Sequence, residues 1–167
     1  ERIRHVVGRA ADLDGVDALI HAAAFIPPSM DASHASQCLE QNGVATLRLL
    51  EATMRAGVRS FVYVSAGNAY RAKSSPAVED DALYPSGRAT FYLTSKIVGE
   101  MFADHAARSG SIRLVILRPS AIYGTSKPGV VATFAGRLRK NEAVTIQDGG
   151  RYRADLVHVD DVAWMAE

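Results

Sequence analysis

The stretch Ser60-Phe61-Val62-Tyr63-Val64-Ser65 is the clearest strand in the sequence, because it is β-branched and aromatic throughout. Its apolar residues do not alternate with polar ones, a pattern typical of strands that are buried on both faces of a parallel sheet. Two runs of the same kind lie on either side of it, at 18–24 and 112–117. Shorter strands are predicted at 3–7, 143–146 and 155–159.

Helical patterns separate these strands. From 32 to 56, apolar residues recur at steps of three and four, and Gly57 is a fitting C-terminal stop. Residues 90–109 predict a second helix and 130–141 a third, and Asp160 is a candidate N-cap for a fourth. Strands that alternate with helices in this way predict right-handed βαβ units and a parallel sheet.

The carboxyl ends of the predicted strands are where a ligand site is expected, because parallel sheets of this kind bind ligands there. Three segments fall at such ends: Ala22–Ala24, Ser65–Gly67 and Pro119–Tyr123. Ser65–Gly67 runs into the predicted loop at 66–88, and Pro119–Tyr123 begins the predicted loop at 119–128.

A phenol and an ammonium lie four residues apart in Phe91-Tyr92-Leu93-Thr94-Ser95-Lys96. If this segment is helical, Tyr92 and Lys96 share one face. A nearby ammonium stabilises a phenolate and lowers the phenol pKa toward neutrality, which makes the phenol usable as a proton donor and acceptor. The start of this helix would lie at the same sheet edge as the strand ends, so the pair is a candidate site.

Size and composition limit the number of domains, the cellular compartment and the partners that are expected. A chain of 167 residues, 48% hydrophobic and 22% charged, fits one globular domain. A net charge of +1 offers no basic field for nucleic acid, and no apolar run is long enough to span a bilayer. We therefore expect no nucleic-acid or membrane partner. The single Cys38 excludes an internal disulfide, so we expect a cytoplasmic protein. Because the chain opens at Glu1 without Met, we expect a fragment.

In this order the segments resemble the extended short-chain dehydrogenase/reductase superfamily, in its NAD-dependent epimerase/dehydratase branch. The segments that carry the resemblance are Gly15–Ala24, Asn42–Ala52, Gly57–Ser65, the Tyr92 and Lys96 pair, Leu117–Gly124 and Asp155–Ala163. The resemblance implies an α/β fold, a Rossmann-like doubly wound parallel sheet that is incomplete at both ends. It also implies that residues 1–167 are a partial NAD(P)-binding domain, in which 143–167 begin the substrate-side C-terminal portion.

The resemblance further implies roles for single residues. Tyr92 would donate and accept the proton, and Lys96 would hold the nicotinamide ribose hydroxyls and depress the Tyr92 pKa. Asn42 would be structural and bond the backbone of the neighbouring strand. The cofactor, NAD or NADP, would be bound by Ala22, Ala23, Ala24, Val64, Tyr92, Lys96, Pro119 and Ile122.

The sequence departs from the family pattern in three places. The Gly-rich phosphate turn would lie upstream of Glu1. The position that usually carries the catalytic hydroxyl is Ala66, with Ser65 one residue early, so Ser65 is a catalytic candidate only if the strand end is irregular. Ala154 stands where nucleotide-sugar enzymes usually carry Arg, with Arg153 one residue earlier.

Two functions follow from this reading. The first is an NAD(P)-dependent oxidoreductase, epimerase or dehydratase that acts on a small carbinol or sugar-like substrate by hydride transfer. The second is a non-catalytic NAD(P)-binding or regulatory module of the same fold, in which Ala66 marks the lost hydroxyl. Relatives of this kind often dimerise through the helices that carry Asn42 and Tyr92, so we also expect a homodimer.

Overall fold

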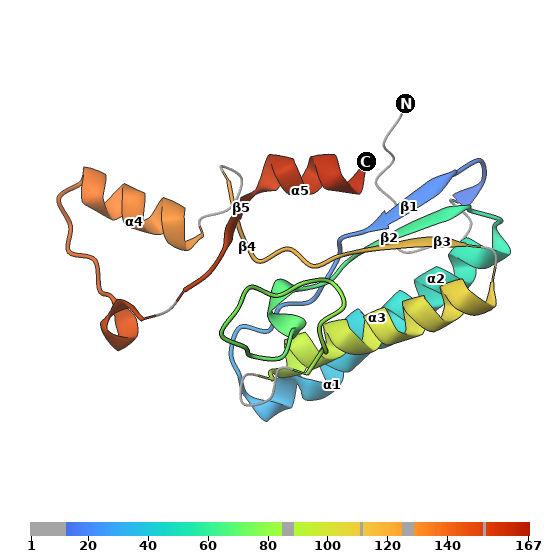
Figure 1. Ribbon diagram of the computed structural model, residues 1–167, viewed down its shortest axis with the longest axis horizontal. Coiled ribbons are helices and arrows are strands. Elements are labelled where there is room, and N and C mark those ends of the chain that lie inside the picture. The colour runs from blue at the N-terminus through green and yellow to red at the C-terminus, as the bar shows by residue number, and fades with distance from the viewer. Residues whose placement is uncertain (1–12, 85–88, 111, 125–128, 152) are drawn as a thin grey trace. The chain divides into compact units, whose positions relative to one another are not determined.

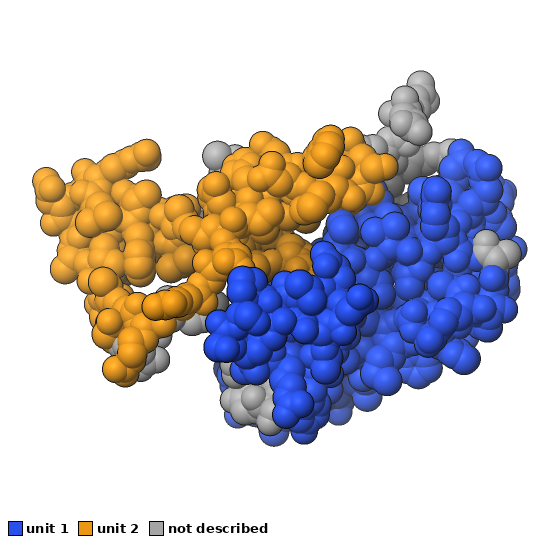
Figure 2. Space-filling model, viewed as in Figure 1, with its two compact units in different colours: residues 1–117 blue, residues 118–167 orange. Residues whose placement is uncertain are grey.

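The computed structural model describes residues 13–84, 89–110, 112–124, 129–151 and 153–167, so the strand predicted at 3–7 lies outside the described residues. The chain divides into two compact units, Glu1–Leu117 and Arg118–Glu167, which Figure 2 shows in blue and orange.

A three-stranded parallel sheet organises the first unit. Its order is β1-β2-β3, and Tyr63 on the central strand lies beside His21 on one neighbour and Ile116 on the other. Helices α1 to α3 cover one face of this sheet (Figure 1). The α/β class with a parallel sheet is therefore confirmed, with helices of this unit on one face in the described part. The bounds are β1 Ala18–His21, β2 Ser60–Val64, β3 Arg113–Leu117, α1 Ala35–Cys38, α2 Ala45–Arg55 and α3 Phe91–Ser109.

The region predicted as one helix from 32 to 56 is helical but not uniform. A 3-10 turn, Ala32–His34, leads into α1, and a π-helical segment, Leu39–Val44, joins α1 to α2. After α2, Gly57 adopts the left-handed conformation (φ 74), and the amide of Val58 bonds the Thr53 carbonyl at 3.1 Å. This arrangement is the Schellman motif, so the predicted stop at Gly57 is confirmed.

The core lies between the sheet and the helices. Phe61 and Tyr63 of β2 are both fully buried, because residues two apart on a strand share one face. They pack with buried side chains of the neighbouring elements and of the segments that connect them: Leu13, Leu19, Leu50, Ala52, Val58, Ala103 and Ile112. Burial of this set, which includes Ala103 of α3, holds α3 against the sheet.

The second unit contains a two-stranded parallel sheet of β4 and β5. Two predictions were wrong here. The predicted loop at 119–128 contains β4, because Ala121 to Tyr123 find partners on β5, more than thirty residues later. The short strand predicted at 143–146 does not form, since this stretch has no strand partner in the described part. The bounds are β4 Ala121–Tyr123, α4 Val130–Arg139, β5 Leu156–His158 and α5 Val159–Ala166.

The N-cap of α5 also differs from the prediction. His158 is the capping residue, and its Nδ1 accepts the amide proton of Asp160 at 3.3 Å. Asp160 lies inside the first turn, where a carboxylate is favoured by the helix dipole. The imidazole therefore takes the role that we assigned to the carboxylate.

Candidate active site

Helix α3 carries both members of the predicted pair. Thr90 begins the helix, since its hydroxyl accepts the amide proton of Leu93 at 3.0 Å. Tyr92 lies in the first turn and is half-buried, and Lys96 follows one turn later and is only 1% exposed. The segment is helical as predicted, so the two residues share one face of α3.

The Lys96 ammonium is buried without a hydrogen-bond partner in the described part of the chain. Its Nζ lies 4.2 Å from the centroid of the Tyr63 ring. Burial lowers the pKa of Lys96 to about 8, and the Glu100 carboxylate opposes this shift. A large fraction of Lys96 is still charged at neutral pH, and its three N–H donors are open to a ligand.

Burial raises the pKa of the Tyr92 phenol. The lowered Tyr92 pKa that we expected is therefore wrong in this structure. The physical reason is that the Lys96 ammonium lies over the Tyr63 ring, and desolvation alone then acts on the Tyr92 phenol. The neutral phenol is a proton donor at neutral pH.

Ser65 follows the last residue of β2 and is 5% exposed, and its Oγ has no partner in the described residues. Its amide bonds the Leu117 carbonyl at 2.7 Å, which extends the ladder by one residue. Ser65 therefore shares the face of Tyr63, over whose ring Lys96 lies. Ala66 has extended backbone (φ −145, ψ 130), so its methyl points to the opposite face.

Asn42 joins the end of β1 to the turn of α3 that carries Tyr92. Its side-chain amide bonds the Phe25 amide at 2.7 Å and the Phe25 carbonyl at 2.9 Å. It also donates to Ser95 Oγ at 3.0 Å, and Ser95 donates to the Tyr92 carbonyl at 2.7 Å. The structural role predicted for Asn42 is confirmed. The exposed residues Ala22–Ala24 lie in the segment that this anchor holds.

His21 on β1 is a buried neutral base that contacts α2. Its Nε2 lies 2.8 Å from Thr46 Oγ1, and the Thr46 hydroxyl donates its single proton to the Asn42 carbonyl at 2.6 Å. Nε2 must therefore be the donor to Thr46, which fixes the tautomer. Burial and the nearby Lys96 charge lower the pKa of His21 to about 4, in agreement with a structural role.

Tyr63, Thr46 and Ser95 belong to this site, and sequence reasoning missed them. Their contacts join residues that are far apart in the chain, and no local sequence motif marks these positions. Val64 ends β2 and is half-buried. The other predicted site residues lie in the second unit, where Pro119 is half-buried and Ile122 is 44% exposed on β4.

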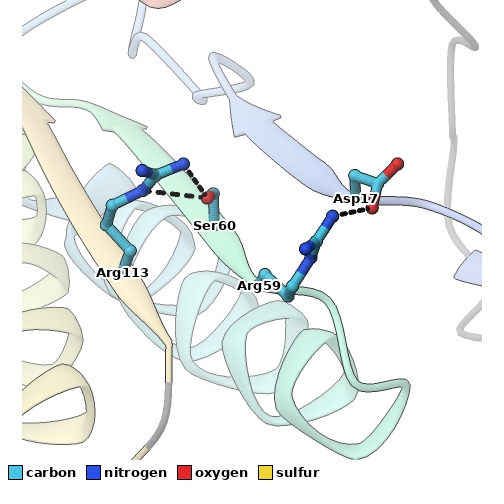
Figure 3. Close-up of polar contacts among 4 residues, drawn as sticks. All are labelled: Asp17, Arg59, Ser60 and Arg113. Carbon is cyan, nitrogen blue, oxygen red and sulfur yellow. Dashed lines mark hydrogen bonds and ion pairs between the residues drawn. The ribbon is translucent and has the colours of Figure 1, made fainter.

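A hollow of about 380 Å³ lies at the opposite edge of the sheet, at the amino ends of the strands. Figure 3 shows the polar contacts of four residues that line it. Arg59 and Asp17 form an ion pair at 2.5 Å, and both side chains are 79% exposed. Arg113 donates to Ser60 Oγ through Nε at 3.1 Å and through Nη2 at 2.9 Å. Because these groups satisfy one another and lie away from the carboxyl ends of the strands, this hollow is not the candidate site.

In the described part of the chain, no three His, Cys, Asp or Glu side chains come together as a metal site would require. None of the described helices is both long and apolar enough to cross a membrane.

A family model described as "NAD dependent epimerase/dehydratase family" matches residues 4–166. The UDP-glucose 4-epimerase of Mycolicibacterium smegmatis is 29% identical over 163 residues, which cover 91% of this chain and 52% of that protein. The chain spans about half the length of curated relatives such as this one.

Solved structures agree with this match. The UDP-glucose 4-epimerase of Thermotoga maritima, solved with UDP-glucose, has a TM-score of 0.77 at 29% identity, covering 89% of this chain and 50% of that one. A dTDP-glucose 4,6-dehydratase from Streptomyces venezuelae, solved with NAD bound, has a TM-score of 0.81 at 27% identity, covering 94% and 49%.

Proposed function

Because this chain belongs to the NAD-dependent epimerase/dehydratase family, we propose that it supplies the Tyr92 and Lys96 pair of an active site for hydride transfer at a carbinol carbon. One observation carries the proposal. The Lys96 ammonium is 1% exposed and has no hydrogen-bond partner in the described part, one turn beyond Tyr92. A buried cation without a partner destabilises a fold, so groups of this kind are found mainly where they serve a ligand.

The residues present fit a dinucleotide cofactor. Lys96 Nζ and Ser65 Oγ are both buried and lack partners in the described part, as hydroxyl-binding groups would be. In the proposal Lys96 holds the nicotinamide ribose hydroxyls, and the cofactor lies against Ala22–Ala24 and Val64. NAD is the first candidate because the similar dehydratase structure holds it, and NADP is the alternative. When bound, the nicotinamide ring would supply or accept the hydride.

Tyr92 is the proposed proton donor and acceptor. Its phenol is neutral at neutral pH because burial raises its pKa. In the reducing direction the phenol would donate its proton to the carbonyl oxygen of the substrate as hydride reaches the carbon. In the oxidising direction the phenolate form of Tyr92 would accept the hydroxyl proton of the substrate as hydride leaves the carbon.

The substrate is proposed to be a small carbinol or sugar-like molecule. UDP-glucose is bound in the similar Thermotoga maritima epimerase, which supports a sugar. We further propose that Pro119 and Ile122 approach the nicotinamide and that residues 143–167 begin the substrate side. A homodimer through the helices that carry Asn42 and Tyr92 belongs to the same proposal. Leu39 of the π segment that carries Asn42 and Met101 of α3 are large exposed apolar residues, as such an interface would use.

A non-catalytic NAD(P)-binding module is the second candidate function. The observation that favours it is the absence of a hydroxyl at Ala66, whose methyl points away from the face that Ser65 shares with Tyr63. The two candidates differ in turnover and agree in cofactor binding.

Thermal melting of the full-length protein with NAD and with NADP tests the binding that both functions require. A ligand that binds the folded state raises the melting temperature. We expect NAD or NADP to raise it for the wild type and for Lys140→Met, an exposed lysine, and to raise it much less for Lys96→Met. Equal stabilisation of wild type and Lys96→Met would refute the role given to Lys96.

A further inference from the structure

Tyr63 contacts Lys96 at both ends of that residue. The Tyr63 hydroxyl donates to the Lys96 backbone carbonyl at 3.2 Å. The Lys96 side chain then returns over the sheet, so that Nζ lies 4.2 Å from the centroid of the Tyr63 ring. One fully buried aromatic side chain on the central strand therefore touches both the turn of α3 that carries Lys96 and its charged end.

Gly99 makes this contact possible. A Cβ at position 99 would overlap Tyr63 Oη and would lie 2.9 Å from Tyr63 Cζ. The absence of a side chain at Gly99 lets the phenol reach the Lys96 carbonyl between two turns of α3. The open space beside Gly99 is therefore occupied by the ring of Tyr63.

The Tyr63 ring is also the group that compensates the ammonium most directly. Lys96 Nζ has no hydrogen-bond acceptor in the described part. The titratable groups around it are His21 on β1, Tyr63 on β2, and Tyr92 and Glu100 on its own helix. The packed π segment and α2 contribute Asn42 and Thr46, which do not titrate.

Each of these neighbours has a fixed effect on the ammonium. His21 is neutral at pH 7 because its pKa lies at about 4, and burial raises the pKa of Tyr63 so that it stays a neutral phenol. Glu100 attracts the charge from one turn away. The negative face of an aromatic ring attracts a cation, and more strongly where water is excluded.

We propose that Tyr63 is a positioning residue for Lys96, whose ring face holds the ammonium and whose hydroxyl holds the turn of α3 that carries it. The inference rests on the proposed function, because the position of the Lys96 ammonium matters only if Lys96 binds the cofactor. His21 on the neighbouring strand also contacts the Tyr63 ring, with the two ring centroids 5.6 Å apart.

An NMR titration of Lys96 in the full-length protein tests this role and requires neither cofactor nor substrate. The Lys96 side-chain signals would be assigned by their loss in Lys96→Met. In the wild type, the Hε protons over the ring are expected to be shifted upfield. Tyr63→Leu is expected to remove the upfield shift and to lower the pKa of Lys96 by roughly 0.5 to 1.5 units, because the cation loses its ring.

Two further variants keep the test decisive if Tyr63→Leu does not fold. Tyr63→Phe keeps the ring and loses the hydroxyl, so the pKa of Lys96 should stay close to that of the wild type. Gly99→Ala should displace the ring from the α3 side, with the same loss of upfield shift as Tyr63→Leu. Gly136→Ala in α4 is the matched control, since a Cβ there meets nothing within 4 Å.

A Lys96 pKa and Hε shift that stay unchanged in Tyr63→Leu, or in Gly99→Ala if Tyr63→Leu does not fold, would overturn the inference. A lowered pKa in these two variants and not in Tyr63→Phe would support it. Failure of the proposed function is seen in a different assay. There, NAD or NADP would raise the melting temperature of Lys96→Met as much as that of the wild type.

Discussion

Replacement of Lys96 by Met is expected to make the folded protein more stable at neutral pH, although it removes the residue proposed to hold the cofactor. Lys96 is 1% exposed, and its pKa falls from 10.5 to about 8 on burial. Since one pKa unit corresponds to about 1.4 kcal/mol, the charged form is disfavoured in the folded state by about 3 kcal/mol. Met fills similar space without charge but loses the attraction to the Tyr63 ring, roughly 1–2 kcal/mol. The expected net gain is about 1–2 kcal/mol.

The gain in stability from Lys96→Met should become smaller as the pH rises. The unfolded chain keeps the Lys96 proton up to about pH 10.4, and the folded chain releases it near pH 8. Between these values the unfolded state binds more protons, so the unfolding free energy of the wild type rises with pH. Lys96→Met lacks this rise, and its advantage should therefore shrink between pH 8 and pH 10.

Urea denaturation of the wild type and Lys96→Met at pH 7 and pH 10 measures both effects. Lys140→Met, which removes an exposed lysine at the end of α4, is the control and should change stability by less than about 0.5 kcal/mol. A Lys96→Met variant that is less stable than the wild type at pH 7, or a difference that does not change with pH, would refute the reasoning.

Three further predictions concern the groups that hold the site together. His21 has a pKa of about 4 in the folded protein against 6.5 as its ordinary value, so the unfolded state binds more protons between these values; acid denaturation curves should show stability lost as pH falls from 6.5 to 4, with a weaker loss in His21→Gln. Asn42→Leu leaves the Phe25 amide and carbonyl without their partner and should cost about 2–4 kcal/mol in urea melts, where a neutral result would deny the anchor. Thr90→Ala removes the cap of α3 and should cost about 1 kcal/mol by the same assay, whereas Thr90→Ser should cost little.

The strands of the first unit could be predicted because each one is a short apolar run bounded by turn signals, as at Ser60–Val64. The π segment around Asn42 could not, since its residues are equally compatible with a regular helix. Asn42 in this segment makes tertiary bonds with the Phe25 backbone, which a local pattern cannot show. β4 was missed because its partner lies on β5, and pairing over that distance leaves no local pattern.

For the site, spacing alone predicted that Tyr92 and Lys96 share a helix face, because both residues lie in one element. The role of Tyr63 could not be predicted in this way. Its contact with Lys96 joins residues 33 apart in sequence and depends on the missing side chain at Gly99. The direction of the Tyr92 pKa was mispredicted for the same reason, since the pairing of Lys96 with Tyr63 is a tertiary contact.

The turnover rate of Tyr92→Phe in the full-length protein, with cofactor and a substrate that the wild type converts, tests most directly whether the phenol on α3 moves the proton. Tyr84→Phe is the matched control, because Tyr84 is 67% exposed. We predict that kcat falls by about 10²- to 10⁴-fold in Tyr92→Phe and stays at the wild-type value in Tyr84→Phe. A Tyr92→Phe variant that turns over at the wild-type rate would contradict the assignment of the active site.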